Sequence, residues 1–162
     1  MTRLADRPTV EVSALIAAPA SSVWELVTDI NISARFQDEF QEATWLDEGP
    51  ALGARFIGKN ATSRFSWETT CTIVDYTPGE RFSWAVNDVD DPVAVWTFEL
   101  TAYDDGTELT YRRVVGTGPS GLTAAIEKYP DREEEIIAKR DEVHRQHMQS
   151  VVDGIRSLAE AP

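Results

Sequence analysis

The sequence predicts an α+β fold in which a long C-terminal helix covers one face of a curved antiparallel sheet of about seven strands. Three observations predict this fold class. Residues 9–16 alternate apolar and polar side chains, which is the period of a half-buried strand. Residues 40–115 form strand-like runs separated by turn residues. Residues 131–158 form one long helical segment that begins with acids, where the helix dipole favours them.

The other elements follow in order along a single domain of residues 1–162. Residues 18–29 predict a helix with Ser21 or Ser22 as its N-cap, and residues 32–37 predict a second short helix. Asp105-Gly106 indicates a hairpin because this pair tolerates positive φ, and short hairpin connections make the sheet antiparallel. The strands after the first are expected at residues 40–46, 54–60, 66–76, 80–86, 93–103 and 107–115.

The composition disfavours several classes of function. A formal net charge of -13 disfavours nucleic acid and anionic membrane surfaces, because proteins that bind these partners carry a basic face. Cys71 is the only cysteine, so no intrachain disulfide is possible, and no Cys/His cluster has zinc-site spacing. The sequence also lacks a secretory signal and a membrane span. We therefore expect a cytoplasmic protein without membrane insertion, metal or other cofactor.

Two Phe-Ser-Trp triplets flank the turn at Pro78-Gly79. An even-length loop there pairs residues whose numbers sum to 157, which places Trp67 and Trp84 on one face of the sheet. The opposite face then carries Glu68, Thr70, Thr72 and Arg81, with Val74 and Tyr76 as apolar exceptions near the turn. The same argument at Asp105-Gly106 predicts one shared face for Trp96, Phe98, Leu100, Ala102, Leu109, Tyr111, Arg113 and Val115.

The predicted C-terminal helix has polar residues within its apolar arc. At about 100° per residue, Arg140, His144 and His147 fall among the apolar side chains, all in the first half of the helix. An unpartnered charge or imidazole in a dry core is costly. The first half of the helix is therefore expected to face a wet or ligand-filled cavity that Trp67 and Trp84 also line.

Several segments carry a resemblance to a known family: Ala18–Asp29, Leu52–Phe56, Val74–Phe82, Trp96–Leu100, Asp105–Thr110 and the terminal helix. With these segments the sequence resembles the START-like (SRPBCC) superfamily of polyketide cyclase/dehydrase and lipid-transport proteins, also called the helix-grip fold. The resemblance covers nearly the whole chain and implies a ligand between the curved sheet and the long helix. It is less informative about function, since such proteins bind lipids, sterols, polyketides or other apolar molecules, or act as co-chaperones.

The first functional hypothesis is binding of a small apolar or aromatic molecule in this cavity. The walls would be Trp67, Trp84, Trp96, Phe98, Tyr111 and Met148. Arg113, Arg140, His144 and His147 would supply the polar contacts. Each also has a purely structural interpretation: the arginines pair with acids or reach the rim, and the histidines and the tyrosine are satisfied core groups.

Two other hypotheses stay open. A polyketide aromatase/cyclase would use Tyr111, Arg113 or His147 to move a proton or stabilise an enolate. A co-chaperone-like module would instead have a filled interior and a large exposed apolar patch. The identity of the ligand, the oligomeric state and the loop that gates the cavity are left open by the sequence.

Residues 116–121 match the pattern Gly-x-Gly-x-x-Gly but in the wrong context for a dinucleotide site. The segment follows an antiparallel hairpin, and no strand comes after it. We expect a loop near the cavity mouth. Cys71 lies in the middle of a strand without a basic neighbour and is expected to be an inert buried thiol.

Overall fold

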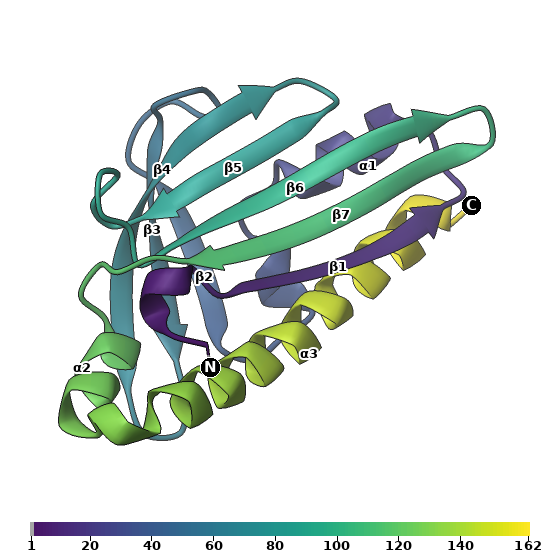
Figure 1. The fold of residues 1–162 in the computed structure, drawn as a ribbon. Coiled ribbons are helices and arrows are strands. Elements are labelled where there is room, and N and C mark those ends of the chain that lie inside the picture. The colour runs from purple at the N-terminus through teal and green to yellow at the C-terminus, as the bar shows by residue number, and fades with distance from the viewer. Residues whose placement is uncertain (1) are drawn as a thin grey trace.

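The computed structural model describes residues 2–162 as one antiparallel sheet with a long helix, α3, lying along it (Figure 1). The strand order is β1-β7-β6-β5-β4-β3-β2, so the first strand lies beside the last and the rest form a meander. The strands are β1 (Thr9–Ile16), β2 (Phe40–Trp45), β3 (Arg55–Ala61), β4 (Ser66–Thr77), β5 (Arg81–Val86), β6 (Ala94–Tyr103) and β7 (Gly106–Val115). The helices are α1 (Ala20–Val27), α2 (Gly121–Lys128) and α3 (Glu133–Glu160), with 3-10 turns η1 (Leu4–Asp6), η2 (Ser33–Arg35) and η3 (Pro130–Arg132).

The predicted α+β, helix-grip fold class is confirmed, and the two short helices after β1 differ in detail. Pro19, not Ser21 or Ser22, is the N-cap of α1, and no side chain caps this helix. The segment expected to be helical at 32–37 contains only the single turn η2. Gln37 ends it, because its side-chain amide donates to the Phe40 carbonyl and its side-chain oxygen accepts from the Phe40 amide, with N–O distances of 3.0 Å in both cases.

The register predicted for β4 and β5 holds far from the turn and changes near it. Ile73 pairs with Trp84 as predicted, but a bulge at Val74 shifts the register so that Tyr76 pairs with Phe82. The bulge turns the Tyr76 ring onto the apolar face, where its centroid lies 5.7 Å from that of Trp24. The side of the sheet expected for Tyr76 is therefore corrected.

The register predicted for β6 and β7 is confirmed, although the role of the glycine between them is not. Trp96 pairs with Arg113, and Phe98 with Tyr111. Gly106 is the first residue of β7 and does not have positive φ. A Cβ there would lie 2.3 Å from the Ile16 carbonyl oxygen, so close approach to the end of β1 requires the glycine.

The second half of α3 packs into the main hydrophobic core against β1 and α1. Val151, Val152 and Ile155 are fully buried there. A Cβ on Gly154 would lie 2.4 Å from the Phe36 ring, so this glycine lets the ring lie directly on the helix. Within residues 2–162, no helix has the length and apolar content needed to cross a membrane.

Candidate ligand-binding cavity

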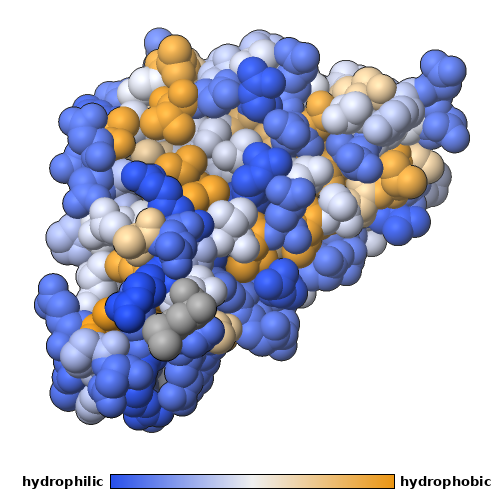
Figure 2. Space-filling model, in the orientation of Figure 1, coloured by the Kyte–Doolittle hydropathy of each residue, from blue (hydrophilic) through white to orange (hydrophobic). Residues whose placement is uncertain are grey.

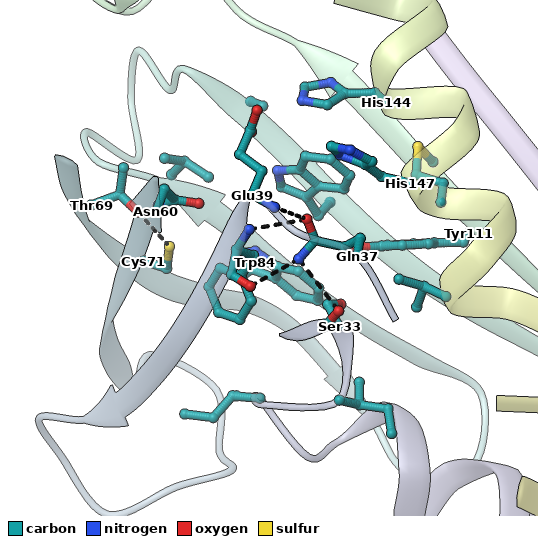
Figure 3. Close-up of a pocket in the computed structure, with 18 of the residues that line it drawn as sticks. Ser33, Gln37, Glu39, Asn60, Thr69, Cys71, Trp84, Tyr111, His144 and His147 are labelled. Carbon is teal, nitrogen blue, oxygen red and sulfur yellow. Dashed lines mark hydrogen bonds between the residues drawn. The ribbon is translucent and has the colours of Figure 1, made fainter. Parts of the chain in front are cut away.

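A cavity of about 180 Å³ lies between the sheet and the first half of α3. Strands β3 to β7 contribute one wall and α3 contributes another, while the segment from the end of α1 to the start of β2 lines a third side. Figure 3 shows His144 and His147 projecting from α3, with Trp84 among the side chains that face them and Gln37 and Ser33 below. The cavity thus lies where the sequence placed it.

Every candidate ligand-binding residue named from the sequence except Arg113 lines this cavity. Trp67 and Trp84 do share it, and Trp67 lies at the partly exposed end of β4. The lining candidates are Trp67, Trp84, Trp96, Phe98, Tyr111, Arg140, His144, His147 and Met148. Their role in binding stays a prediction.

The aromatic side chains of neighbouring strands form a continuous wall. The Phe98 and Tyr111 rings are stacked, with centroids 4.0 Å apart and an interplanar angle of 15°. Trp84 lies 5.9 Å from Phe98, and Trp96 lies 5.6 Å from Tyr111, both in tilted contacts. These residues form cross-strand pairs in the ladder, so the register fixes the wall.

Arg113 belongs to the buried layer behind the cavity. Its side chain is fully buried, and its guanidinium donates to His144 Nδ1 at 2.8 Å, to Asp141 Oδ1 at 2.5 Å and to the Pro8 carbonyl at 3.2 Å. Burial lowers the pKa of Arg113 from its usual value, while the hydrogen bond and charge of Asp141 raise it. Arginine nonetheless stays protonated in proteins. Arg113 lies on the predicted face of β7, and α3 supplies two of its partners, His144 and Asp141.

His144 is held neutral beside this arginine. Burial lowers its pKa to about 2, and the nearby charges of Arg140, Arg113 and His147 act in the same direction. Its ring meets the Trp96 ring edge to face, with centroids 5.1 Å apart. His144 is therefore a fixed polar group of the cavity wall and not a proton carrier at neutral pH.

The polar end of the cavity contains an ion pair that the sequence did not predict. Arg140 on α3 donates two hydrogen bonds to Glu39, with N–O distances of 2.8 and 2.6 Å. Glu39 precedes β2 in a segment without helical or strand periodicity, so no pattern marked it. The only hint was the arginine itself, which lies on the inner arc of the helix and needs an acid.

Tyr111 is a protonated phenol facing the cavity. Burial raises its pKa, and its contact with the Ser33 side chain opposes this only in part. The hydroxyl can therefore donate or accept a hydrogen bond but does not act as a base at neutral pH. His147 also lines the cavity, and within residues 2–162 its ring makes no hydrogen bond.

Cys71 is unreactive where it lines the cavity. Burial raises the pKa of its thiol to about 12, and its polar neighbour is the Thr69 hydroxyl, 3.7 Å from the sulfur. A thiolate is the reactive form of cysteine, so this side chain serves as a small wall residue. Among residues 2–162, no three His, Cys, Asp or Glu side chains gather as metal ligands.

Gly116 and Gly118 in the loop at 116–121 serve packing and do not form a phosphate cradle. The Gly116 amide donates to the Val93 carbonyl at 2.9 Å, and the Gly118 amide donates to the Pro92 carbonyl at 3.1 Å. A Cβ on Gly116 would lie 2.1 Å from the Pro92 carbonyl oxygen. The loop is therefore tied to the segment before β6, next to Val93 and Ala94 of the cavity wall.

Comparison with known proteins agrees with this architecture. A polyketide cyclase-like protein from Corynebacterium glutamicum is 30% identical, with 94% of this chain and 91% of that chain covered and a TM-score of 0.69. The Zhui aromatase/cyclase from a Streptomyces species is 17% identical, with 94% and 93% covered and a TM-score of 0.66. The two-domain aromatase/cyclase StfQ of the steffimycin biosynthetic pathway is 13% identical, with 94% and 50% covered and a TM-score of 0.74.

The likenesses to the two aromatase/cyclases, at 17% and 13% identity, show the fold alone. A search of curated protein sequences gave no match. The sequence profile of the family described as polyketide cyclase / dehydrase and lipid transport matches residues 7–133, which run from β1 to the start of α3. The chain therefore belongs to the polyketide cyclase/dehydrase and lipid-transport family.

Proposed function

We propose that this protein binds a small apolar or aromatic molecule in the cavity between the sheet and the first half of α3. The observation that carries the proposal is the continuous wall of stacked and tilted aromatic rings facing the cavity. Pockets that bind such molecules are mostly apolar and contain a few polar groups that orient the ligand. Here those groups would be Tyr111, His144, His147 and the Arg140–Glu39 pair.

Membership of the family supports the same proposal, because the description of the family includes both cyclases and lipid carriers. The partner-binding alternative is less well supported, since it predicts a filled interior. On the face seen in Figure 2, apolar side chains lie in small patches among polar ones. The large exposed apolar residues, such as Leu15, Leu52 and Tyr129, come from different elements.

A second candidate function is a cyclase reaction in the same cavity. The observation that favours it is the pair of polar side chains facing the cavity, the protonated Tyr111 phenol and the His147 imidazole, which makes no hydrogen bond among residues 2–162. His147 would move a proton and Tyr111 would donate to an enolate oxygen. Arg113 is less suited to this chemistry because it does not line the cavity, and its Nη1 and Nη2 atoms donate to His144, Asp141 and Pro8.

The binding proposal is tested by native mass spectrometry of the purified protein and by tryptophan fluorescence during titration with fatty acids, sterols and polycyclic phenols. A retained ligand mass, or quenching that saturates and is lost in Trp84→Leu, supports binding in the cavity. No retained mass and no response across the panel contradict it.

The cyclase reaction is tested separately with a synthetic poly-β-ketone. Turnover that falls by about 100-fold or more in His147→Ala supports it, since general acid–base groups contribute on this scale. Turnover that is equal in wild type and His147→Ala removes His147 from the reaction.

A further inference from the structure

The buried guanidinium of Arg113 determines which nitrogen of His144 carries a proton. Arg113 Nη1 lies 2.8 Å from His144 Nδ1, and the same side chain is bonded to Asp141 and the Pro8 carbonyl. A guanidinium only donates hydrogen bonds. Nδ1 must therefore be the acceptor and carry no proton, which leaves the proton of the neutral ring on Nε2.

The alternative protonation states are unfavourable at this site. A proton on Nδ1 would face the N–H of Arg113 with no acceptor between them. A doubly protonated ring would add a second buried cation beside Arg113, and Arg140 also lies close enough to oppose it. Asp141 balances the charge of the arginine and holds it in place from the preceding turn of α3.

The Nε2 atom makes no hydrogen bond within residues 2–162, and His144 lines the cavity. Figure 3 shows its ring extending from α3 into the space opposite Glu39. We propose that Asp141, Arg113 and His144 form a fixed hydrogen-bonded chain. This chain presents the Nε2–H of His144 to the cavity as a hydrogen-bond donor for an acceptor oxygen of the ligand. This inference rests on the proposed function and specifies the chemistry of its ligand.

The acceptor that fits best is an uncharged carbonyl oxygen. The cations around the donor already have carboxylate partners: Arg113 is paired with Asp141, and Arg140 with Glu39. A ligand carboxylate would lose its hydration without gaining a free cation, and would approach the charge of Glu39. A carbonyl needs only one donor and brings no charge. The ligand class is thus an apolar or aromatic ketone.

The donor is expected to be insensitive to pH near neutrality. The charged and titratable groups around His144 are Arg113 from β7, Asp141, Arg140 and His147 from α3, and Glu39 from the segment before β2. Arg140, Arg113 and His147 all disfavour protonation of its ring. The Nε2–H donor is therefore present both with and without ligand.

The test compares two probes that differ by one carbonyl oxygen, 1-tetralone and tetralin, by fluorescence titration. One hydrogen bond gives 1-tetralone an advantage of about threefold to tenfold in dissociation constant in the wild type. His144→Phe keeps a ring but removes the donor, so the ratio is expected to fall to about one. His144→Gln keeps an N–H near the position of Nε2 and is expected to recover part of the ratio.

Equal binding of the two probes in wild type, or a ratio unchanged in His144→Phe, overturns the inference and leaves the proposed function intact. Failure of both probes to bind counts against the proposed function instead. The ring nitrogens of His144, followed by ¹⁵N NMR in wild type from pH 5 to 8, then decide the donor without any ligand or variant. A protonated Nε2 and a bare Nδ1 throughout are expected, and a protonated Nδ1 overturns the inference.

Discussion

The two halves of α3 are built for different environments. The first half, residues 133–148, contributes Arg140, His144, His147 and Met148 to a cavity wall. The second half, residues 149–160, buries Val152 and Ile155 against β1 and α1, and only Val151, at its start, also lines the cavity. One helix thus serves as a cavity wall at one end and as core at the other.

The two halves differ in what the polar residues of the buried arc indicate. In the second half, the apolar arc needs only shape, and even Gly154 is explained by the Phe36 ring. In the first half, each polar residue in the arc either has a specific partner or faces the cavity. The polar groups in the buried arc of the predicted helix therefore indicated a cavity.

The largest expected effect on stability comes from breaking the hydrogen-bonded chain of Asp141, Arg113 and His144 at the first half of α3. Asp141→Ala leaves the guanidinium of Arg113 buried without its carboxylate, so we expect the free energy of unfolding to fall by about 3–5 kcal/mol. Urea denaturation measures this change. The neighbouring exposed acid provides the control: Glu142→Ala is expected to change stability by less than about 0.5 kcal/mol. Equal effects of the two substitutions would mean that Asp141 does not stabilise the buried guanidinium of Arg113.

A smaller effect is expected from overfilling the second half. Gly154→Ala places a methyl group against the Phe36 ring, which is expected to cost about 1–3 kcal/mol in the free energy of unfolding. Gly121→Ala is the matched control, because a Cβ there meets nothing within 4 Å. A Gly154→Ala protein as stable as wild type in thermal denaturation would mean that the two surfaces are not in close contact.

The pH dependence of stability reports on the first half of α3, because the buried His144 lies there. The pKa of His144 is lowered from 6.5 to about 2 in the folded protein, so below pH 6.5 the unfolded state binds the proton and the folded state does not. The stability is complete above about pH 6.5 and falls as the pH decreases towards 2. Between pH 7.5 and 5, wild type is expected to lose about 1–2 kcal/mol that His144→Gln does not lose.

The window above pH 5 separates this histidine from the carboxylates. The acids with lowered pKa, Asp47, Asp75, Glu135 and Glu160, have ordinary values of 3.8 or 4.5 and titrate mainly below the window. Denaturant midpoints at closely spaced pH values measure the slope. Identical slopes for wild type and His144→Gln would mean that folding does not lower the pKa of His144.

The smallest effect is expected at the polar end of the cavity. Glu39→Gln removes the ion pair with Arg140, which is partly exposed, so the free energy of unfolding should change by only about 0–1 kcal/mol. The difference between variant and wild type should shrink as salt is added. A loss comparable to that of Asp141→Ala would show that this pair is part of the buried framework.

The sequence predicted regular elements well because their signals are periodic. The alternation in β1 and the Asp105-Gly106 hairpin led to the correct strands and to the correct β6–β7 register. The bulge at Val74 could not be predicted, since an extra residue in one strand leaves the alternation locally unreadable. The segment from Thr28 to Glu39 was the least predictable, because side-chain hydrogen bonds from Gln37 define it instead of periodicity.

The cavity was predicted in outline and its polar chemistry only in part. The inward arc of α3 identified Arg140, His144 and His147. The contact of Arg113 from β7 with His144 and Asp141 was not predictable, because it depends on how the helix crosses the sheet. Glu39 was missed for the same reason, since its partner lies 101 residues away in the chain.

NMR mapping of ligand contacts along α3 tests most directly whether the first half of this helix faces a ligand while the second half belongs to the core. In ¹H–¹³C spectra recorded during addition of 1-tetralone, the Met148 methyl resonance and the Trp84 and Trp96 ring resonances should shift and saturate together. The Ile155 and Val152 methyl resonances should stay in place. Shifts confined to the second half of α3 or to exposed residues, with Met148 unmoved, would contradict the account of one helix with a ligand-facing half and a core half.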